Sequence, residues 1–353
     1  MIDVAGAVAV EAIEPGSRDA GVAAHYGDPM REQRVLATDV GLVDRSHRSV
    51  LAVPGVERAS WLHSLTTQHL AGLRAGQGTE LLVLSPHGHV EHHAMVAEDG
   101  DTTWLDTEPG SGSDLLAFLS KMRFLTRVEP RDATAEWAVL SLVGPRAVDA
   151  LGLPLKDPEV LPVPGPKFAA GSVPSTSSSL YAVAALPSGG LARRGRLGVD
   201  LIVPRDAVAD VVASLGVPLA GLWAYEAIRV AALVPRAGLE TDHRTIPADV
   251  DLIGPAVHLD KGCYRGQETV ARVHNLGRPP RRLVLLHLDG VATDQPPVAG
   301  TPVTTEDGRA VGFIGTAVRH FELGMVALAV VKRNVPDDAV LRAGESVAAI
   351  DRA

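Results

Sequence analysis

The sequence predicts an α+β protein, with a mixed body over residues 1–277 and a small all-β, barrel-like domain over residues 278–353. In the body, runs that alternate apolar and polar residues as strands do are interrupted by segments with apolar residues at helical spacing. From Arg278 onward the pattern changes to short alternating runs with glycine turns, including "RAVGFIGTAV" and "MVALAVVKRNV". These two observations predict both the fold class and the domain division.

The first unit of the body lies between residues 40 and 98. Its first part, "VGLVDRSHRSVLAVPG", and its last part, "GTELLVLSPHGHVEHHAMVAE", alternate as strands do, and "ERASWLHSLTTQHL" between them has helical spacing. Pro86 and Gly88 supply turn geometry, so we predict a hairpin at "SPHGH". A helix follows at "GSDLLAFLSKMRF", with Ser113 or Asp114 as its N-terminal cap.

The second unit of the body begins with "AEWAVLSLVGPRAVDALGL", whose pattern predicts a strand, a Gly-Pro turn and a helix. Residues 160–192 contain prolines, glycines and a serine run, so we predict a mobile surface loop there. "RLGVDLIVP" is predicted to be a strand, and "LWAYEAIRVAALVP" a helix that ends near Pro235.

Composition limits the classes of function. A net charge of -9 argues against direct nucleic-acid binding, which depends on many Lys and Arg contacts with phosphates. No run approaches the ~18 apolar residues of a membrane span, and the first residues lack the pattern of a signal peptide. The single cysteine cannot form an intramolecular disulfide, which fits a reducing compartment, so we predict a cytoplasmic protein.

That cysteine, Cys263, lies in the polar and glycine-rich stretch "DKGCYRGQETVARVHN". Buried structural cysteines usually have apolar neighbours, whereas a nearby cation such as Lys261 or Arg265 favours a thiolate. The glycines on both sides leave the sulfur accessible. From these residues alone the thiol is either incidental, in a turn, or reactive.

At this motif the chain resembles the YgfZ-type folate-binding proteins, whose signature is K-G-C-Y-x-G-Q-E. The matching residues are Lys261, Gly262, Cys263, Tyr264, Gly266, Gln267 and Glu268. Upstream, "GLVDRSHRSVLAVPG" and "LHSLTTQHLAGLRAGQGTELLVLSPHG" look like the opening of the wider superfamily that includes the glycine-cleavage aminomethyltransferase. The resemblance implies interleaved antiparallel α/β subdomains around a central folate cavity, followed by a β-barrel-like domain.

The resemblance also implies a function. YgfZ-type proteins bind tetrahydrofolate or a one-carbon derivative and support the assembly or repair of iron-sulfur clusters in client enzymes, including enzymes that modify tRNA. The expected partners are therefore folate and iron-sulfur clients. Because the chain is acidic, we expect any link to tRNA to run through the clients.

Within the motif, the resemblance marks Cys263 as a functional thiol at the mouth of the cavity, acting as a redox group, a nucleophile or a transient ligand. Lys261 would act electrostatically on this thiol; otherwise it is a solvated charge. Gln267 and Glu268 would bind a pterin edge or cap the next element. Tyr264, counted with the cofactor-binding residues, is expected to orient the loop by packing.

Three further residues are assigned to the cofactor by the resemblance. Arg229, in "AIRVAALV", falls at an arginine that lies close to the folate in the aminomethyltransferase, although it also fits a snorkelling side chain at a helix edge. Asp200 falls where that transferase has a strand carboxylate that accepts hydrogen bonds from the pterin; the alternative is a surface aspartate. His93 is the third.

His92 and His93 occupy the place of an acidic pair in the aminomethyltransferase. An imidazole can transfer protons near neutral pH but supplies no fixed negative charge. This difference favours the YgfZ type, and a folate-dependent aminomethyltransferase or demethylase is the alternative. A metal-dependent enzyme is the second alternative, because His89, Glu91 and His93 would share one face of a strand.

Overall fold

The structure is a computed structural model that describes the chain except residues 1, 3, 158, 163–175, 290–294 and 352–353. Twelve strands of the body form one sheet, in the order β14-β3-β9-β13-β12-β11-β5-β6-β7-β4-β8, with β10 paired to β11. Every pairing in it is antiparallel except that of β14 with β3. Segments from both ends of the body sequence alternate in this order, so the two halves are interleaved.

The strands of this sheet are β3 (Gly41–Asp44), β4 (Ser49–Pro54), β5 (Gln77–Leu84), β6 (Val90–Glu98), β7 (Thr102–Thr107), β8 (Arg131–Asp132), β9 (Trp137–Val143), β10 (Glu159–Pro162), β11 (Thr176–Ala185), β12 (Leu191–Arg194), β13 (Gly198–Pro204) and β14 (Leu219–Ala220). A short pair, β1 (Val8–Ala9) and β2 (Ala23–His25), precedes them.

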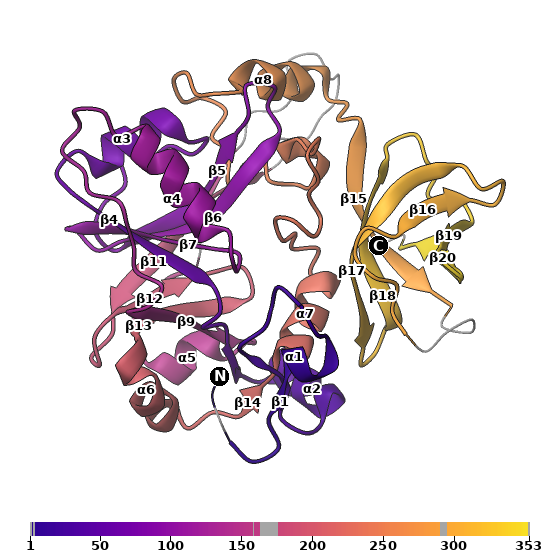
Figure 1. The fold of residues 1–353 in the computed structure, drawn as a ribbon, viewed down its shortest axis with the longest axis horizontal. Coiled ribbons are helices and arrows are strands. Elements are labelled where there is room, and N and C mark those ends of the chain that lie inside the picture. Colours follow the sequence, from indigo (N-terminus) through magenta and orange to yellow (C-terminus); the bar gives the residue numbers. More distant parts are fainter. Residues whose placement is uncertain (1, 3, 158, 163–175, 290–294, 352–353) are drawn as a thin grey trace.

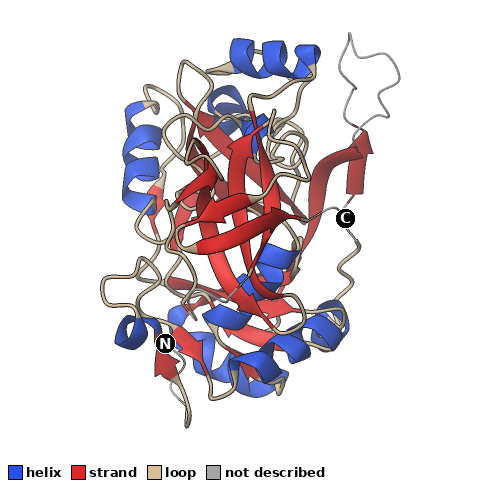
Figure 2. Cartoon of the chain, turned by 90° about the vertical axis from the view of Figure 1, so that its right-hand side faces the viewer, coloured by secondary structure: helices blue, strands red, loops and turns tan. Residues whose placement is uncertain are grey.

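Helices lie around the sheet, as Figures 1 and 2 show. The α-helices are α1 (Val10–Ile13), α2 (Pro29–Thr38), α3 (Arg58–Leu65), α4 (Gly112–Lys121), α5 (Ala147–Leu151), α6 (Val208–Leu215), α7 (Leu222–Ala231) and α8 (Gln267–Leu276); two 3₁₀ turns are η1 (Arg205–Ala207) and η2 (Pro247–Asp249). None of the helices in the described ranges is long and apolar enough to cross a membrane.

The C-terminal strands close into an antiparallel barrel, in the order β15-β18-β17-β16-β19-β20. They are β15 (Arg281–Leu288), β16 (Pro302–Thr305), β17 (Ala310–His320), β18 (Gly324–Lys332), β19 (Leu341–Ala343) and β20 (Ser346–Ile350). The predicted α+β class with a terminal barrel is confirmed.

Several predicted elements are found where the pattern placed them, and two predictions are wrong. The hairpin at residues 85–89 forms, with Gly88 at a φ of 81° and the Ser85 nitrogen donating to the His89 carbonyl. The cap of α4 is Ser111, without a side-chain hydrogen bond, instead of Ser113 or Asp114. Part of the predicted loop 160–192, residues 163–175, lies outside the described residues, but its remainder contributes β10, β11 and β12 to the sheet.

An apolar core joins the barrel to the body. Leu82 and Leu84 of β5 pack in one cluster with Leu283 of β15 and Leu328 of β18, and Tyr264 of the cysteine motif belongs to it. A separate cluster fills the inside of the barrel. Burial of these apolar side chains stabilises the contacts between their elements, so the barrel and the cysteine motif are both held against the β5–β6 hairpin.

Candidate ligand-binding cavity

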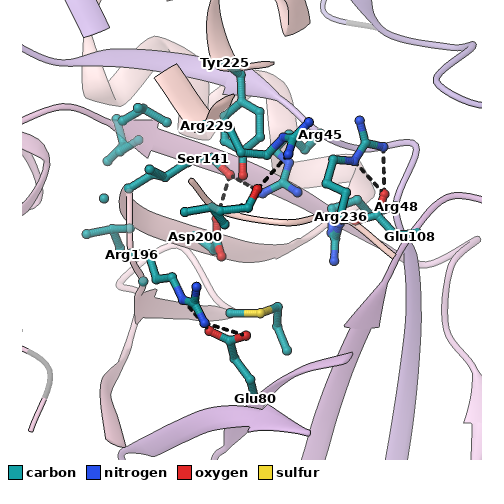
Figure 3. A pocket seen from close by; sticks show the side chains of 18 of the residues that line it. Arg45, Arg48, Glu80, Glu108, Ser141, Arg196, Asp200, Tyr225, Arg229 and Arg236 are labelled. Atoms are coloured by element: carbon teal, nitrogen blue, oxygen red, sulfur yellow. Dashed lines mark hydrogen bonds and ion pairs between the residues drawn. The ribbon is translucent and has the colours of Figure 1, made fainter. Parts of the chain in front are cut away.

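A cavity opens in the body where α7 faces the sheet. Figure 3 shows charged side chains that pair in its wall: Arg196 with Glu80, Arg45 with Asp200, and Arg48 with Glu108. The charged and titratable residues of its wall are Arg45, Arg48, Glu80, His93, Glu108, Arg196, Asp200, Tyr225, Arg229 and Arg236. Five guanidinium groups face three carboxylates, so the wall is polar and rich in hydrogen-bond donors.

Asp200, on β13, lines this cavity, and its contact with a pterin stays a prediction. Its Oδ1 accepts a hydrogen bond from Ser141 Oγ at 2.6 Å, and its Oδ2 pairs with Arg193 Nη2 at 2.8 Å. Ser141 lies directly across from Asp200 in the paired strand β9. These contacts fix the orientation of a carboxylate whose side chain remains 15% exposed, and each oxygen keeps room for a further donor.

Arg45, directly after β3, lies beside this carboxylate. Its Nη1 is 3.6 Å from Asp200 Oδ1 and donates to Ser141 Oγ at 3.3 Å. The guanidinium group lies over the Tyr225 ring at 4.3 Å from the ring centre, where a cation is attracted by the π face. The two carboxylate oxygens of Asp200, which accept, and the guanidinium group of Arg45, which donates, therefore lie side by side in the wall. The sequence pattern did not predict Arg45.

A cluster of ion pairs closes one end of the cavity. Arg236, in the segment after α7, bonds Glu108 at 2.7 Å and Asp19 at 2.7 Å, and Arg48 bonds the other oxygen of Glu108 at 2.8 Å. Burial alone would raise the pKa of Glu108, but the two arginines hold it well below its usual range. The cluster thus joins the N-terminal segment, the sheet and α7 through charges that stay ionised.

Arg229 lines the cavity, yet the protein itself uses all of its donors. Its Nε and Nη2 bond Glu226 at 3.0 and 2.6 Å, Nη1 bonds the Val234 carbonyl at 2.6 Å and Glu240 at 3.3 Å, and Nη2 also bonds Thr316 at 2.6 Å. A guanidinium group has five N–H donors, and five contacts occupy them. This geometry is that of a structural residue linking α7 to the barrel, so its contact with a ligand stays a prediction.

His93 also faces the cavity, from β6, and it belongs to a cluster that the sequence did not predict. Its Nε2 is 2.9 Å from Oε2 of Glu80, a buried residue on the neighbouring strand β5. The other oxygen of Glu80 accepts from Tyr181 in β11 and from Arg196 Nε at 2.9 Å. The cavity wall therefore does contain a carboxylate beside the imidazole.

The cysteine motif lies apart from the cavity, and none of its residues lines the wall. Cys263 is exposed. The Lys261 ammonium group donates to the carbonyls of His63, Thr66 and Gln68. The position predicted for the thiol, at the mouth of the cavity, is therefore not seen.

The rest of the motif serves local structure. Tyr264 is buried in the core that joins body and barrel, as its packing interpretation expected. Gln267 donates to the Lys261 carbonyl at 3.3 Å, and Glu268 lies in the first turn of α8. Arg265 pairs with Glu91 at 3.0 Å. Binding of a cofactor by Tyr264, Gln267 or Glu268 stays a prediction.

The predicted metal set of His89, Glu91 and His93 does not assemble. His89 lies in the turn before β6, Glu91 is paired with Arg265, and His93 is bonded to Glu80. Across the described ranges, no group of three His, Cys, Asp or Glu side chains is placed to hold a metal ion. The second alternative function thus loses the observation on which it depended.

Comparisons with known proteins show what this chain is similar to. Residues 24–159 match the GCVT N-terminal domain family. A chloroplastic protein of Arabidopsis thaliana, whose name marks it provisionally as a transferase, is 25% identical over 305 residues, which are 81% of this chain and 65% of that protein. The chain thus spans just under two thirds of that relative. The aminomethyltransferase of Symbiobacterium thermophilum is 28% identical over 306 residues, 82% of this chain and 78% of the relative.

Among solved structures, the glycine cleavage system aminomethyltransferase T from Bartonella henselae has a similar fold. The superposition covers 99% of this chain and 94% of that one, with a TM-score of 0.74 at 18% sequence identity. The likeness extends over both the body and the terminal barrel.

Proposed function

We propose that the chain is a member of the aminomethyltransferase (GCVT) superfamily, to which its family match and its relatives point, and that it binds tetrahydrofolate or a one-carbon derivative in this cavity. The observation that carries the proposal is the pair of Asp200 and Arg45. A pterin edge presents two N–H donors and a carbonyl acceptor, and a carboxylate beside a guanidinium group offers the complementary set. Leu142, Val143 and Leu197 supply apolar wall for the ring.

For the reaction, we propose transfer of a one-carbon unit between an amine and tetrahydrofolate, as in an aminomethyltransferase or demethylase. The names of the relatives favour this reading over a purely supporting role. His92 and His93 replace the acidic pair of the aminomethyltransferase, but Glu80, beside His93, supplies a buried negative charge in the wall of the cavity. The bound folate would supply the nitrogen that takes up the one-carbon unit, while Asp200 and Arg45 orient its ring.

The binding proposal is tested by titrating tetrahydrofolate into the purified chain, without oxygen, by calorimetry. Hydrogen bonds to a charged group contribute about 1.5–3 kcal/mol, so Asp200→Asn should bind roughly ten- to a hundredfold more weakly. Asp206→Asn, at an exposed position in η1, is the matched control and should bind as the wild type does. Equal affinity of wild type and Asp200→Asn, or no binding by the wild type, would contradict the proposal.

A second function, support of iron-sulfur clusters in client enzymes, is favoured by one observation. Cys263, in the motif of the YgfZ resemblance, is exposed on a surface outside the cavity, where a thiol can meet a partner protein. Complementation tests it: wild type and Cys263→Ser are introduced into a strain that lacks its YgfZ-type protein, and the activity of an iron-sulfur tRNA-modifying enzyme is measured. Rescue by the wild type alone is expected, and equal rescue by both would remove the thiol from the mechanism.

A further inference from the structure

Glu80 is a carboxylate enclosed by donors in one wall of the cavity. It lies on β5 at 2% exposure. Tyr181 and Arg196 bond its Oε1, and His93 Nε2 lies 2.9 Å from its Oε2. The strand register explains the meeting: Glu80 faces Met95 and Leu82 faces His93, so Glu80 and His93 are diagonal neighbours on one face of the β5–β6 pair.

The charge state of Glu80 decides which nitrogen of His93 carries hydrogen. Burial alone would raise the pKa of Glu80, but the Arg196 guanidinium and the hydrogen bonds from His93 and Tyr181 hold it well below its usual range. An ionised carboxylate can only accept hydrogen bonds, so the His93 Nε2 must be the donor. In the neutral ring Nδ1 is then an unprotonated acceptor, and no other residue of the described ranges bonds it.

Stabilisation of the buried Glu80 charge explains only part of this arrangement. The ion pair of Glu80 with Arg196, together with the Tyr181 hydroxyl, already compensates a buried carboxylate. His93 adds a titratable ring on the cavity side, with its side chain 14% exposed. A carboxylate that fixes the tautomer of an imidazole facing a cavity is the usual construction of a general base.

We propose that Nδ1 of His93 accepts a proton from the amine bound in the cavity, and that Glu80 is the positioning residue that holds the ring in the Nε2–H tautomer. The inference rests on the one-carbon function proposed above. In the step, an N–H bond of the protonated, ammonium form of the bound amine breaks, its electron pair stays on that nitrogen, which becomes a neutral amine, and the proton forms a new bond to His93 Nδ1. The resulting imidazolium is stabilised by the Glu80 carboxylate and gives the proton to solvent on product release.

The tautomer itself is the first readout, because the proposed base requires a bare Nδ1 that is free to accept a proton. Ring ¹⁵N shifts of His93 are recorded at a pH where the ring is neutral and are assigned by their loss in His93→Gln. We expect a bare Nδ1 and a protonated Nε2 in the wild type, and a mixture of tautomers in Glu80→Gln, whose amide can also donate. His87→Gln, at an exposed turn position, should leave the His93 signals unchanged.

Turnover is the second readout, measured as formaldehyde-equivalent transfer to tetrahydrofolate. General acid–base catalysis contributes about 10²–10⁴-fold, so His93→Gln should lower kcat by about a hundredfold or more while the dissociation constant of tetrahydrofolate changes less than about threefold. Glu80→Gln should lower kcat through the lost tautomer, and Tyr181→Phe, which keeps the charge, should do so less. If Glu80→Gln does not fold, the wild-type tautomer and His93→Gln decide.

A protonated Nδ1 in the wild type, or an unchanged kcat in His93→Gln, would overturn the inference. Failure of the wild type to bind tetrahydrofolate would instead overturn the proposed function. The two failures are distinguishable because the tautomer is read without any folate present.

Discussion

Lys261 places its ammonium group among three backbone carbonyls, those of His63, Thr66 and Gln68. His63 lies in the last turn of α3, where carbonyls lack helical partners and a cation is favoured. Burial lowers the pKa of Lys261 to about 8, which still leaves it a cation with three N–H donors at neutral pH. Lys261 therefore holds the cysteine loop against the end of α3. Its contacts do not support the predicted electrostatic action of Lys261 on the Cys263 thiol.

Replacement of Lys261 by methionine should destabilise the chain, because the side chain keeps its length while three carbonyls lose their donor. Buried acceptors without partners cost about 1–3 kcal/mol each, so we expect the free energy of unfolding to fall by about 2 kcal/mol or more. Urea unfolding at pH 7 measures it. Arg265→Met, four residues further along the chain at an exposed ion pair, should change the value by less than about 1 kcal/mol. Similar values for both variants would refute this role.

At the scale of elements, local patterns predicted what depends on neighbouring residues. The β5–β6 hairpin was predictable because apolar alternation and the turn residues lie within one short stretch. The strand β11 was not, since its serines resemble a loop and its place is set by pairing with β5 and β12, about a hundred residues and about ten residues away. Tyr181, which this strand brings to Glu80, could not be predicted for the same reason.

The residues of the candidate site could also be predicted only in part. Asp200 and His93 were placed in the cavity by a resemblance that extends over their segments. Arg45 and Glu80 lie in the same wall but belong to no recognised motif. In the sequence, Glu80 is unusual only as the lone charge within the apolar run "GTELLVL". Their roles arise from strands and loops that meet only in the folded chain.

The junction of β17 with the body provides an element-level prediction. A Cβ atom added at Gly315 would lie 2.5 Å from Oε1 and 2.7 Å from Cγ of Glu240. Glu240 cannot retreat, because it is fully buried and bonds Arg229 and Thr316. Gly315→Ala should therefore lower the free energy of unfolding by about 1–3 kcal/mol, the usual cost of overpacking.

Thermal unfolding followed by circular dichroism measures the effect. Gly72→Ala is the matched control, because the nearest atom to its added Cβ is His69 Nε2 at 3.9 Å. We expect the control to unfold at the wild-type temperature or slightly above it, since alanine restricts the unfolded chain. A Gly315→Ala variant as stable as Gly72→Ala would show that Glu240 has more freedom than its contacts indicate.

At the scale of the whole molecule, buried charges join parts that are distant in sequence. Arg236 links Asp19 near the N-terminus to Glu108 after β7, and Arg229 links α7 to Thr316 in the barrel. Such ion pairs stabilise only while their carboxylates stay ionised. The same charges that shape the cavity thus make the fold sensitive to acid.

The stability of the chain should fall as the pH is lowered from 7, in two stages. Burial, then the charges of Lys261, His69 and His258, lowers the pKa of His63 to about 4. The pKa of His63 in the unfolded chain is about 6.5, so the unfolded chain takes up the proton first and stability declines between these two pH values.

The second stage belongs to Asp19. Burial opposes ionisation of Asp19, but His47 and Arg236 hold its pKa well below its usual value, so the stability that ionised Asp19 contributes is lost only below about pH 4. Urea unfolding over pH 3–7 should show both stages, and His63→Gln should make the first stage shallower without changing the second. A wild-type profile that is level from pH 7 to 4, or an unchanged slope in His63→Gln, would contradict the assignment.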